Sequence, residues 1–415
     1  MAATGTDRLT PFEEARELVL GRARRLDAEA VPLREALGRV TAADVRASAP
    51  VPGFDNSAMD GFAVRAADLA GAGSATPVTL AIVDESRAGH PATRPVGPGE
   101  AIAISTGAVL PAGADAVVMV EKTERAGDAL TVAGPVAAGT AVRHAGDDVA
   151  AGELVLPTGT PIGPAELGVL AELGVEPVLC RRRPRLAVVV SGDELVGPNE
   201  PLAPGQIRDA NAHTLRALAE RAGAEVVAEA RVGDDPDATR EALAAALADA
   251  DLLVISGGIS VGAHDHVKGA LARLGVEQVL WRMAFKPGKP TWFGVGGDDG
   301  PLVLGLPGNP VSAMVCFTLL AWPAIRAMLG IDDPPQRTVA ILDDECEREP
   351  NRLHAVRCRL TLRPDGLHAH STGGQASHVL TSMLGAEALA LIPPGDGPLA
   401  PGAEVEIEPL PYASA

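Results

Sequence analysis

A continuous apolar run enters a glycine-rich turn in the stretch Leu252-Leu253-Val254-Ile255-Ser256-Gly257-Gly258-Ile259-Ser260-Val261-Gly262. A short apolar run followed by turn residues is typical of a strand buried on both faces of a parallel sheet. Strand-like and helical runs alternate on both sides of it, from residues 186–190 to residues 302–306. This alternation predicts a three-layer α/β domain, a parallel sheet between two layers of helices, over residues 181–330.

The elements of this domain follow from the periodicity of its apolar residues. The expected strands are residues 186–190, 226–230, 252–256, 279–283 and 302–306. The expected helices are residues 209–222, 237–248 and 266–274, and a long apolar helix from Pro310 that is kinked near Pro323.

Three other regions flank this domain. Residues 51–147 contain short alternating runs cut by Gly and Pro, which predict a β-rich inserted domain. The insertion divides a mixed N-terminal domain into residues 1–50 and 148–180, in which Thr10-Pro11-Phe12-Glu13 indicates a capping box at the start of a helix. After the proline-rich break at residues 332–335, short runs predict a small barrel-like β domain over residues 335–415. The fold class is therefore multidomain α/β and β.

The composition limits the classes of partner. A formal net charge of −19 disfavours nucleic acid and anionic membrane surfaces, because both attract clustered positive charge. The apolar run from Val311 to Trp322 is interrupted by polar residues and is shorter than the ~18 residues that span a bilayer. The N-terminus lacks the basic and apolar segments of a signal peptide. We therefore expect a cytoplasmic protein with no nucleic-acid and no membrane partner.

Cysteine and lysine usage add two further expectations. Cysteines at positions 180, 316, 346 and 358 match neither a zinc site nor a disulfide framework, so reduced structural thiols are expected. Of 35 basic residues only four are lysines, and Lys268, Lys286 and Lys289 lie close together in sequence. Compact ammonium groups kept in one region suit an oxyanion, although chance clustering explains the pattern equally well.

Ligands of open parallel sheets bind beyond the carboxyl ends of the strands, and three loops at such positions are unusual. The loop from Ser256 to Gly262 offers backbone N–H groups to an anion, or is a plain turn. Leu306-Pro307-Gly308-Asn309-Pro310 is a stiff binding loop, a helix start with Asn309 as N-cap, or both at once. Ser191-Gly192-Asp193-Glu194 places two carboxylates after a strand, where Mg²⁺ binding or an exposed turn accounts for them.

Lys286-Pro287-Gly288-Lys289-Pro290 holds two ammonium groups three residues apart in a stiff turn. Beside a desolvated oxyanion each contributes ~1.5–3 kcal/mol, whereas in an exposed loop each contributes almost nothing. Together with the carboxylates, this turn predicts a site for phosphoanhydride chemistry.

Fourteen consecutive residues, Pro52-Gly53-Phe54-Asp55-Asn56-Ser57-Ala58-Met59-Asp60-Gly61-Phe62-Ala63-Val64-Arg65, closely resemble the signature of the molybdopterin molybdenumtransferase family, which includes bacterial MoeA and the E domain of gephyrin. Thr106-Gly107, the three strand-end loops and the lysine turn are similar to further motifs of the family, in the same order. The resemblance implies transfer of molybdenum from molybdate to adenylylated molybdopterin, with Mg²⁺-dependent release of AMP.

The resemblance also implies roles for matching residues. The catalytic set is Asp60, Thr106, Glu194, Asp265, Lys286 and Lys289. The substrate-binding set is Ser256, Gly257, Gly258, Ser260, Pro307, Gly308, Asn309, Pro310, Asp234, Arg357 and Ser377. The metal-binding set is Glu194, Asp265, Asp60 and Asp148. Asp147 and Asp235 are alternatives to Asp148 and Asp234.

Several alternatives remain open in the sequence. The family often has an acidic residue and a tyrosine where this chain has His264 and His266, and these histidines either face solvent or bind a transition metal. A molybdopterin adenylyltransferase would resemble only residues 181–330, and a pterin-binding scaffold would share the whole fold without turnover. The preference between molybdate and tungstate and the acceptor molybdoenzymes are open. The resemblance implies a homodimer with composite sites, with molybdopterin adenylyltransferase and molybdoenzymes as possible partners.

Overall fold

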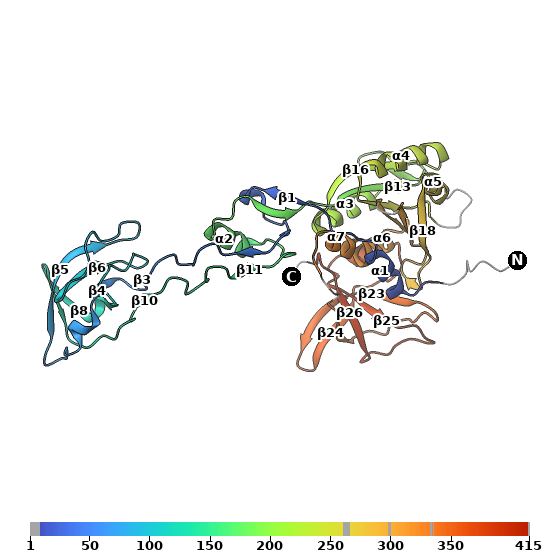
Figure 1. Cartoon of the computed structure of the whole chain (residues 1–415). Helices are drawn as coiled ribbons and strands as arrows, with labels where there is room; N and C mark the ends of the chain where they lie inside the picture. Colours follow the sequence, from blue (N-terminus) through green and yellow to red (C-terminus); the bar gives the residue numbers. More distant parts are fainter. Residues whose placement is uncertain (1–8, 260–265, 298–299, 333, 335, 414–415) are drawn as a thin grey trace. The chain divides into compact units, whose positions relative to one another are not determined.

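The computed structural model describes residues 9–259, 266–297, 300–332, 334 and 336–413 (Figure 1). The chain forms two compact units. Unit 1 consists of the chain up to Ala42, Gly159–Gly163 and the chain from Val178 onward. Unit 2 consists of Ala43–Thr158 and Pro164–Pro177. The division into four domains stays a prediction, because unit 1 contains both the predicted α/β domain and the predicted C-terminal domain.

The central sheet of unit 1 has six strands, in the order β16, β13, β17, β21, β20, β18. Their bounds are β13 Arg185–Ser191, β16 Glu225–Val232, β17 Leu252–Ser256, β18 Val276–Trp281, β20 Trp292–Gly296 and β21 Leu302–Leu306. Neighbouring strands from β16 to β21 are parallel, as predicted, but β20 is antiparallel to both of its neighbours. The sequence analysis missed β20. It follows β18 and precedes β21 through short connections with no helix, and such connections join antiparallel strands.

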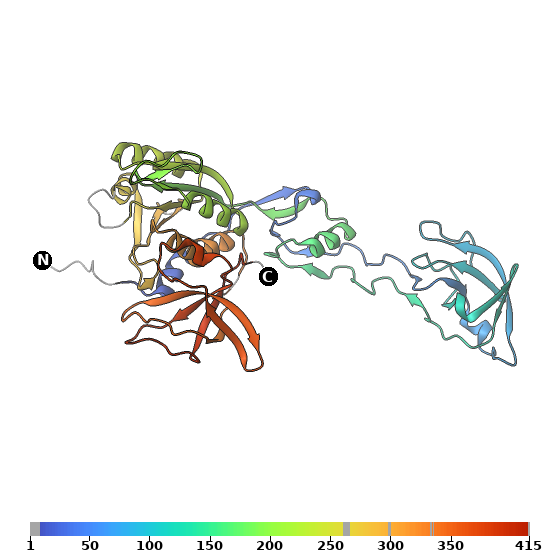
Figure 2. The ribbon, with the colours of Figure 1, turned by 180° about the vertical axis from the view of Figure 1, so that it is seen from behind.

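Two helical layers cover this sheet, so the predicted three-layer arrangement is confirmed (Figures 1 and 2). Alternate residues of β13 face opposite layers: Val188 belongs to a buried cluster with residues of α3, α6 and α7, whereas Val189 belongs to a cluster with residues of α4 and α5. The helices are α3 Asn211–Ala222, α4 Pro236–Asp249, α5 Val267–Arg273, α6 Pro310–Cys316 and α7 Trp322–Met328.

The N-terminal helix α1, Phe12–Leu20, begins without the predicted capping box. Its N-cap residue is Pro11, and no side chain caps the helix. Thr10 instead forms a β-bridge with Met283, and Phe12 stacks on Phe285 at 4.8 Å between ring centroids. Packing against unit 1 therefore fixes the helix start in place of a local side-chain hydrogen bond.

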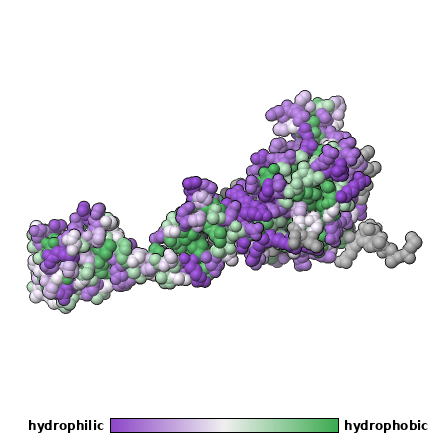
Figure 3. Space-filling model, turned by 45° about the horizontal axis from the view of Figure 1, so that its top comes forward, coloured by the Kyte–Doolittle hydropathy of each residue, from purple (hydrophilic) through white to green (hydrophobic). Residues whose placement is uncertain are grey.

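The long apolar helix runs from α6 through the π-helical turn η4, Phe317–Ala321, into α7. The irregular turn precedes Pro323, which lacks a backbone N–H, close to the predicted kink. Residues Pro310–Met328 are long and apolar enough to cross a membrane by length and composition alone, but 78% of the apolar window is buried inside the protein. Figure 3 shows hydrophilic side chains over much of the visible face of unit 1. This segment is thus a core helix.

The C-terminal strands close into the predicted barrel. β22 Thr338–Leu342, β23 Leu353–Arg363, β24 Gly366–Ser371, β25 Ala388–Ile392 and β26 Glu404–Pro409 each pair with two of the others. Val356, Cys358 and Ile407 belong to the barrel core. The short strand β19, Phe285–Lys286, adds in parallel to β23, so that Lys286 pairs with His354. The lysine turn is therefore tied to the barrel. The short pairs β1 Ala28–Val31 with β12 Val178–Arg181, and β14 Leu195–Val196 with β15 Ile207–Arg208, complete the strands of unit 1.

Unit 2 is β-rich, as predicted, and its six-stranded sheet has the order β7, β4, β6, β5, β9, β8. The strands are β4 Gly61–Val64, β5 Val78–Ser86, β6 Glu100–Ile104, β7 Ala116–Met119, β8 Thr123–Ala126 and β9 Ala129–Val132. Buried clusters lie on its two faces: Ala101 and Val118 belong to one, and Ile102 and Val117 to the other. The unit also contains β2 Val45–Arg46, β3 Asn56–Ser57, β10 Val142–Arg143, β11 Leu154–Leu156 and helix α2 Pro164–Glu172.

All four cysteines are free and buried, in agreement with the expected structural thiols. Burial raises the pKa of Cys316 to about 12 and that of Cys358 to about 12. Neither thiol is a nucleophile near neutral pH.

Candidate active site

Two glycine positions allow the loops after β13 and β17 to touch. Gly257 has a φ of +88°, and a Cβ there would lie 2.4 Å from the carbonyl oxygen of Ser191. Gly258 has a φ of +64°, and its Cβ would lie 2.6 Å from a methyl group of Val267. Any side chain at either position is therefore excluded by space and by backbone conformation. The Gly-Gly sequence is required for close packing of the loops, in addition to any role toward an anion.

Ser256 and Asn211 join three elements at the carboxyl edge of the sheet. Nδ2 of Asn211 donates to Oγ of Ser256 at 2.8 Å and to the carbonyl oxygen of Gly308 at 2.8 Å. Oγ of Ser256 donates to the carbonyl oxygen of Pro307 at 3.2 Å. Ser256 is only 2% exposed, so its hydroxyl holds the loops together. The sequence analysis missed Asn211, although a polar amide at the first residue of α3 is a usable signal.

The second loop is connected to the C-terminal domain. Nδ2 of Asn309 donates to Oγ of Ser377 at 2.9 Å, and the backbone N–H of Val311 donates to the carbonyl oxygen of Ser377 at 3.2 Å. The side chain of Asn309 makes no capping hydrogen bond to α6, whereas Pro310 does occupy the start of that helix. Asn309 is therefore the N-cap residue of α6, as the helix-start explanation predicts, but its side chain contacts Ser377 and does not cap the helix. Two predicted substrate-binding residues, 68 positions apart, are thus brought into contact.

Arg357 is a buried cation with incomplete hydrogen bonding. It is fully buried on β23, and its Nε and Nη2 donate to Oγ of Ser382 at 3.2 and 3.1 Å. Nη2 also lies near the carbonyl oxygens of Gly374 and Ala376, just before Ser377. Within the described residues Nη1 has no partner and no carboxylate pairs with the guanidinium. Burial lowers the pKa of Arg357 to about 10. A buried charge without a counterion suits an anionic ligand.

The two lysines of the stiff turn differ in their surroundings. Nζ of Lys286 lies 2.7 Å from Oε1 of Glu349, and Nη2 of Arg352 lies 2.5 Å from the other carboxylate oxygen. Lys286 and then Arg352 lower the pKa of Glu349 to about 2. Lys289 is exposed, and no ion pair joins it to any described residue. Gly288 between them is required, because a Cβ there would lie 2.3 Å from the sulfur of Cys316.

Some acidic residues at the edge of the sheet accept hydrogen bonds from the backbone, and others are exposed and make no such bond with a described residue. Oδ1 of Asp193 accepts the backbone N–H of Asp234 at 3.0 Å, and Oδ1 of Asp235 caps α4 through Ala238 at 2.7 Å. The carboxylate of Glu194 lies over Gly192, where a Cβ would be 2.4 Å from its oxygen, and both Glu194 and Asp234 are exposed. Because the side chain of Asp235 is used to cap α4, Asp234 is the better candidate of the two for contact with a ligand.

Some predicted residues lie outside the described ranges. These are Ser260, His264 and Asp265. His266 is the N-cap residue of α5 and makes no side-chain capping bond. Within the part of the chain that the structure describes, no group of three His, Cys, Asp or Glu side chains is arranged to hold a metal ion. A complete protein cage for a metal ion is therefore absent from those residues.

The remaining predicted residues belong to unit 2. Oδ1 of Asp60 accepts hydrogen bonds from the backbone N–H of Thr106 at 2.7 Å and from its Oγ1 at 3.1 Å. Asp60 and Thr106, which are 46 positions apart in sequence, are therefore in contact. Oδ2 of Asp147 accepts the backbone N–H of His144 at 2.7 Å within a turn, which leaves Asp148 as the better candidate for a ligand.

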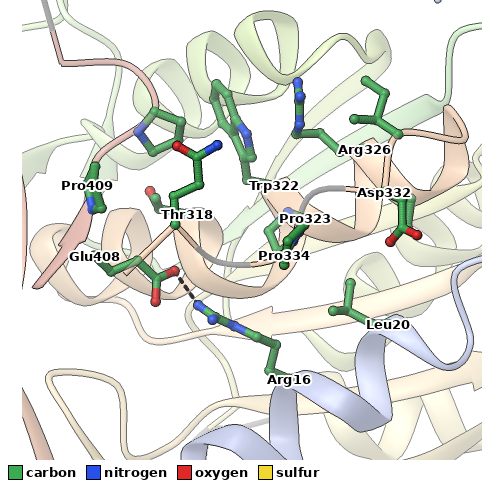
Figure 4. Close-up of a pocket in the computed structure, with 14 residues that line it drawn as sticks. Arg16, Leu20, Thr318, Trp322, Pro323, Arg326, Asp332, Pro334, Glu408 and Pro409 are labelled. Atoms are coloured by element: carbon green, nitrogen blue, oxygen red, sulfur yellow. Dashed lines mark hydrogen bonds and ion pairs between the residues drawn. The ribbon is translucent and has the colours of Figure 1, made fainter. Parts of the chain in front are cut away.

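A separate cavity of about 570 Å³ lies in unit 1 between α1, α7 and β26. Figure 4 shows Arg16 of α1 pointing toward Glu408 of β26, with which it forms an ion pair. Trp322 and Arg326 line the cavity, and none of the predicted site residues does. The Arg16–Glu408 pair joins the N-terminal helix to the barrel, which gives these charges a structural role.

Comparisons with known proteins cover almost the whole chain. Residues 10–174 match the MoeA N-terminal region (domain I and II), residues 187–327 match the probable molybdopterin binding domain, and residues 339–410 match the MoeA C-terminal region (domain IV). The molybdopterin molybdenumtransferase of Nostoc sp. is 37% identical over 390 residues, which are 93% of this chain and 89% of the relative. Molybdopterin molybdenumtransferase 2 of Mycobacterium tuberculosis is 38% identical over 386 residues, 91% of this chain and 94% of the relative. The crystal structure of the molybdopterin biosynthesis MoeA protein from Pyrococcus horikoshii superposes with a TM-score of 0.84 at 33% identity, covering 98% of this chain and 100% of that one.

Proposed function

The chain belongs to the molybdopterin molybdenumtransferase family, and on this basis we propose that it transfers molybdenum from molybdate to the dithiolene sulfurs of adenylylated molybdopterin, releasing AMP. The relatives are matched over nearly their full lengths, so the proposal concerns the complete reaction and not one domain of it. An adenylyltransferase that resembles only the α/β domain is disfavoured by the matches on both sides of that domain.

The observation that supports an oxyanion site is the guanidinium of Arg357, which has no carboxylate partner among the described residues. Nη1 is buried without an acceptor, close to a segment that ends at Ser377. Molybdate is a dianion whose four oxygens accept hydrogen bonds, so it supplies both the acceptor and the counter-charge that Arg357 lacks. Lys289 provides a second, exposed cation on the lysine turn.

The pterin nucleotide is assigned to the loops at the carboxyl edge of the sheet. Gly257 and Gly308 approach closely, because a Cβ on Gly308 would lie 3.7 Å from Cα of Gly257. Their loops are held together by Asn211 and Ser256, and a rigid surface without side chains lets backbone N–H groups approach a phosphate. The hydrogen bond between Asn309 and Ser377 joins this surface to the segment beside Arg357.

Mg²⁺ is assigned to carboxylates of this edge. Glu194 is exposed at the end of β13, and Asp234 lies at the end of the neighbouring strand β16. This incomplete set of oxygen donors fits an ion that retains water and substrate oxygens. When bound, Mg²⁺ would neutralise charge on the phosphoanhydride as AMP leaves. With Glu194, the residues Asp265, Asp60 and Asp148 form the metal-binding set that the resemblance implies. Asp234, which the resemblance assigns to the substrate, is added here because of its position beside β13.

We further propose a cytoplasmic homodimer in which unit 2 of one subunit completes the site of its partner. The observation that supports it is the location of Asp60 and Thr106 on a different compact unit from Lys289 and Arg357. We also propose molybdopterin adenylyltransferase as a supplier of the pterin and molybdoenzymes as acceptors of the cofactor.

The function is tested by measuring AMP release from adenylylated molybdopterin with Mg²⁺, adding molybdate and tungstate in turn. Stimulation by molybdate supports the proposed reaction, and stimulation by tungstate alone identifies a tungsten-inserting relative. Pterin binding without AMP release from active substrate identifies a scaffold and contradicts the proposal.

A further inference from the structure

One end of the C-terminal barrel opens into a second cavity, of about 450 Å³. Residues of the segment after β22, of the start of β23 and of the end of β24 line the cavity. Its inner wall includes Cys346 and Val356, which belong to the barrel core. Asp344, Glu345 and Glu347 also line it, and the last two are exposed. The cavity therefore combines an apolar floor with an acidic rim, and we call it the barrel-mouth cavity.

His354 gives this cavity a specific chemical requirement. The side chain is 3% exposed and lines the cavity. Its Nδ1 lies 2.9 Å from the carbonyl oxygen of Glu347, and because a carbonyl oxygen only accepts, Nδ1 must donate the proton. Burial lowers the pKa of His354, which keeps the ring neutral near pH 7. Nε2 is then a bare acceptor, and none of the described residues donates to it.

Of the three acidic side chains that line the cavity, only that of Asp344 is held in position by contacts with other described residues. Oδ2 of Asp344 accepts the backbone N–H of Ser371 at 2.7 Å and lies 3.1 Å from Nδ1 of His370. Within the described residues, no hydrogen bond or ion pair engages the carboxylate of Glu345 or that of Glu347. A ligand that satisfies Nε2 of His354 must donate a hydrogen bond, and the acidic residues around the cavity favour a ligand that carries positive charge.

We propose that the barrel-mouth cavity binds a small aliphatic organic cation, whose ammonium or guanidinium N–H donates to Nε2 of His354 while Asp344, Glu345 and Glu347 supply the counter-charge. The apolar wall at Cys346 and Val356 accommodates the aliphatic part of such a ligand. A metal ion fits less well, because the described His, Cys, Asp and Glu side chains include no group of three arranged around a common point. None of the residues invoked belongs to the proposed transferase site, so this inference is independent of the proposed function.

The test is isothermal titration calorimetry of the full chain with agmatine, which carries an ammonium and a guanidinium group on a short aliphatic chain. We expect a dissociation constant of about 0.1–1 mM, and at least about tenfold weaker binding to His354→Phe, which removes the acceptor and keeps the ring. Because His354 is buried, Glu347→Gln serves as a second variant that does not disturb the core, and it should weaken binding by about threefold or more.

The matched control is Glu404→Gln, an exposed acidic residue of the same barrel that does not line the cavity. It should bind agmatine like the wild type, and uncharged n-butylurea should not bind to any of the proteins. Absence of agmatine binding up to about 10 mM would mean that Nε2 is satisfied by water alone and would overturn the proposal. Equal affinities of Glu347→Gln, His354→Phe and the control would overturn it as well.

Discussion

Nζ of Lys286 lies 2.7 Å from Oε1 of Glu349, so the lysine turn of the α/β domain is joined to the C-terminal domain by an ion pair. Arg352 contacts the second carboxylate oxygen, and β19 adds a backbone connection to β23 at the same place. One carboxylate between two cations leaves a net positive charge at this junction. The ion pair and the strand pairing hold the turn that carries Lys289 in position. The net positive charge that is left still attracts an anion.

The first prediction concerns the pH dependence of stability. The pKa of Glu349 is about 2 in the folded protein and near 4.5 when unfolded, so its contribution is present above pH 4.5 and is lost as the pH falls toward 2. When the pH is lowered from about 7 to about 3, the wild type should therefore lose about 1 kcal/mol more unfolding free energy than Glu349→Gln, after allowance for solvent screening. Urea denaturation at both pH values measures this. The same loss in Glu349→Gln and in wild type would show that the pair does not stabilise the junction.

The second prediction separates a functional from a structural role for Arg357. Arg357→Met removes a buried charge that has no counterion while keeping most of the volume, so thermal stability without ligand should be unchanged or higher. Wild type should gain stability on adding molybdate and the variant should not. The molybdate concentration for half-maximal AMP release should rise about ten- to a hundredfold. Arg359→Met, an exposed change on the same strand, is the control. A variant that is unstable but has normal molybdate dependence would assign Arg357 to the fold alone.

The third prediction uses adjacent aspartates with different surroundings. Asp235→Ala removes the cap of α4 and should destabilise the protein by about 0.5–2 kcal/mol without changing the Mg²⁺ dependence of AMP release. Asp234→Ala and Glu194→Ala should leave stability nearly unchanged and raise the Mg²⁺ requirement. Thermal melts and Mg²⁺ titrations of all three variants provide the comparison. The reverse pattern would transfer the metal role from Asp234 to Asp235.

The sequence was informative wherever chemistry is local. Glycines and carboxylates that directly follow apolar runs, such as Gly257 and Glu194, could be placed at the carboxyl edge of the sheet because parallel strands end there together. Position in the chain also predicted that Lys286 and Lys289 share a stiff turn. Strand β20 was missed because it lies inside a meander that the α/β alternation does not include.

Contacts between distant segments could not be predicted from one sequence. The hydrogen bond from Asn309 to Ser377 and the ion pair from Lys286 to Glu349 depend on docking of the barrel against the α/β layer. Burial of Arg357 without a carboxylate is likewise a tertiary property. Its position was suggested only by resemblance to the family, and nothing in its neighbouring residues indicates a missing counterion.

The fourth prediction concerns the proposed composite sites. Asp60→Ala alters unit 2 and Lys289→Ala alters unit 1, and each homodimer should be inactive. In a mixed dimer one site combines both unmutated halves, and random mixing makes about half the dimers mixed, so about a quarter of wild-type AMP release should return. The two variants are refolded together and compared with each refolded alone. Failure to recover activity, with mixed dimers verified by mass spectrometry, would show that each site is built within one chain.

The most direct test of the central claim, that this chain is a molybdenumtransferase, is the amount of AMP and of molybdenum-loaded pterin formed per chain when adenylylated molybdopterin is in excess. We predict that both products exceed the amount of protein, form in equal amounts and require Mg²⁺ and molybdate together. AMP release limited to less than one equivalent per chain, or release that does not respond to molybdate, would contradict the assignment.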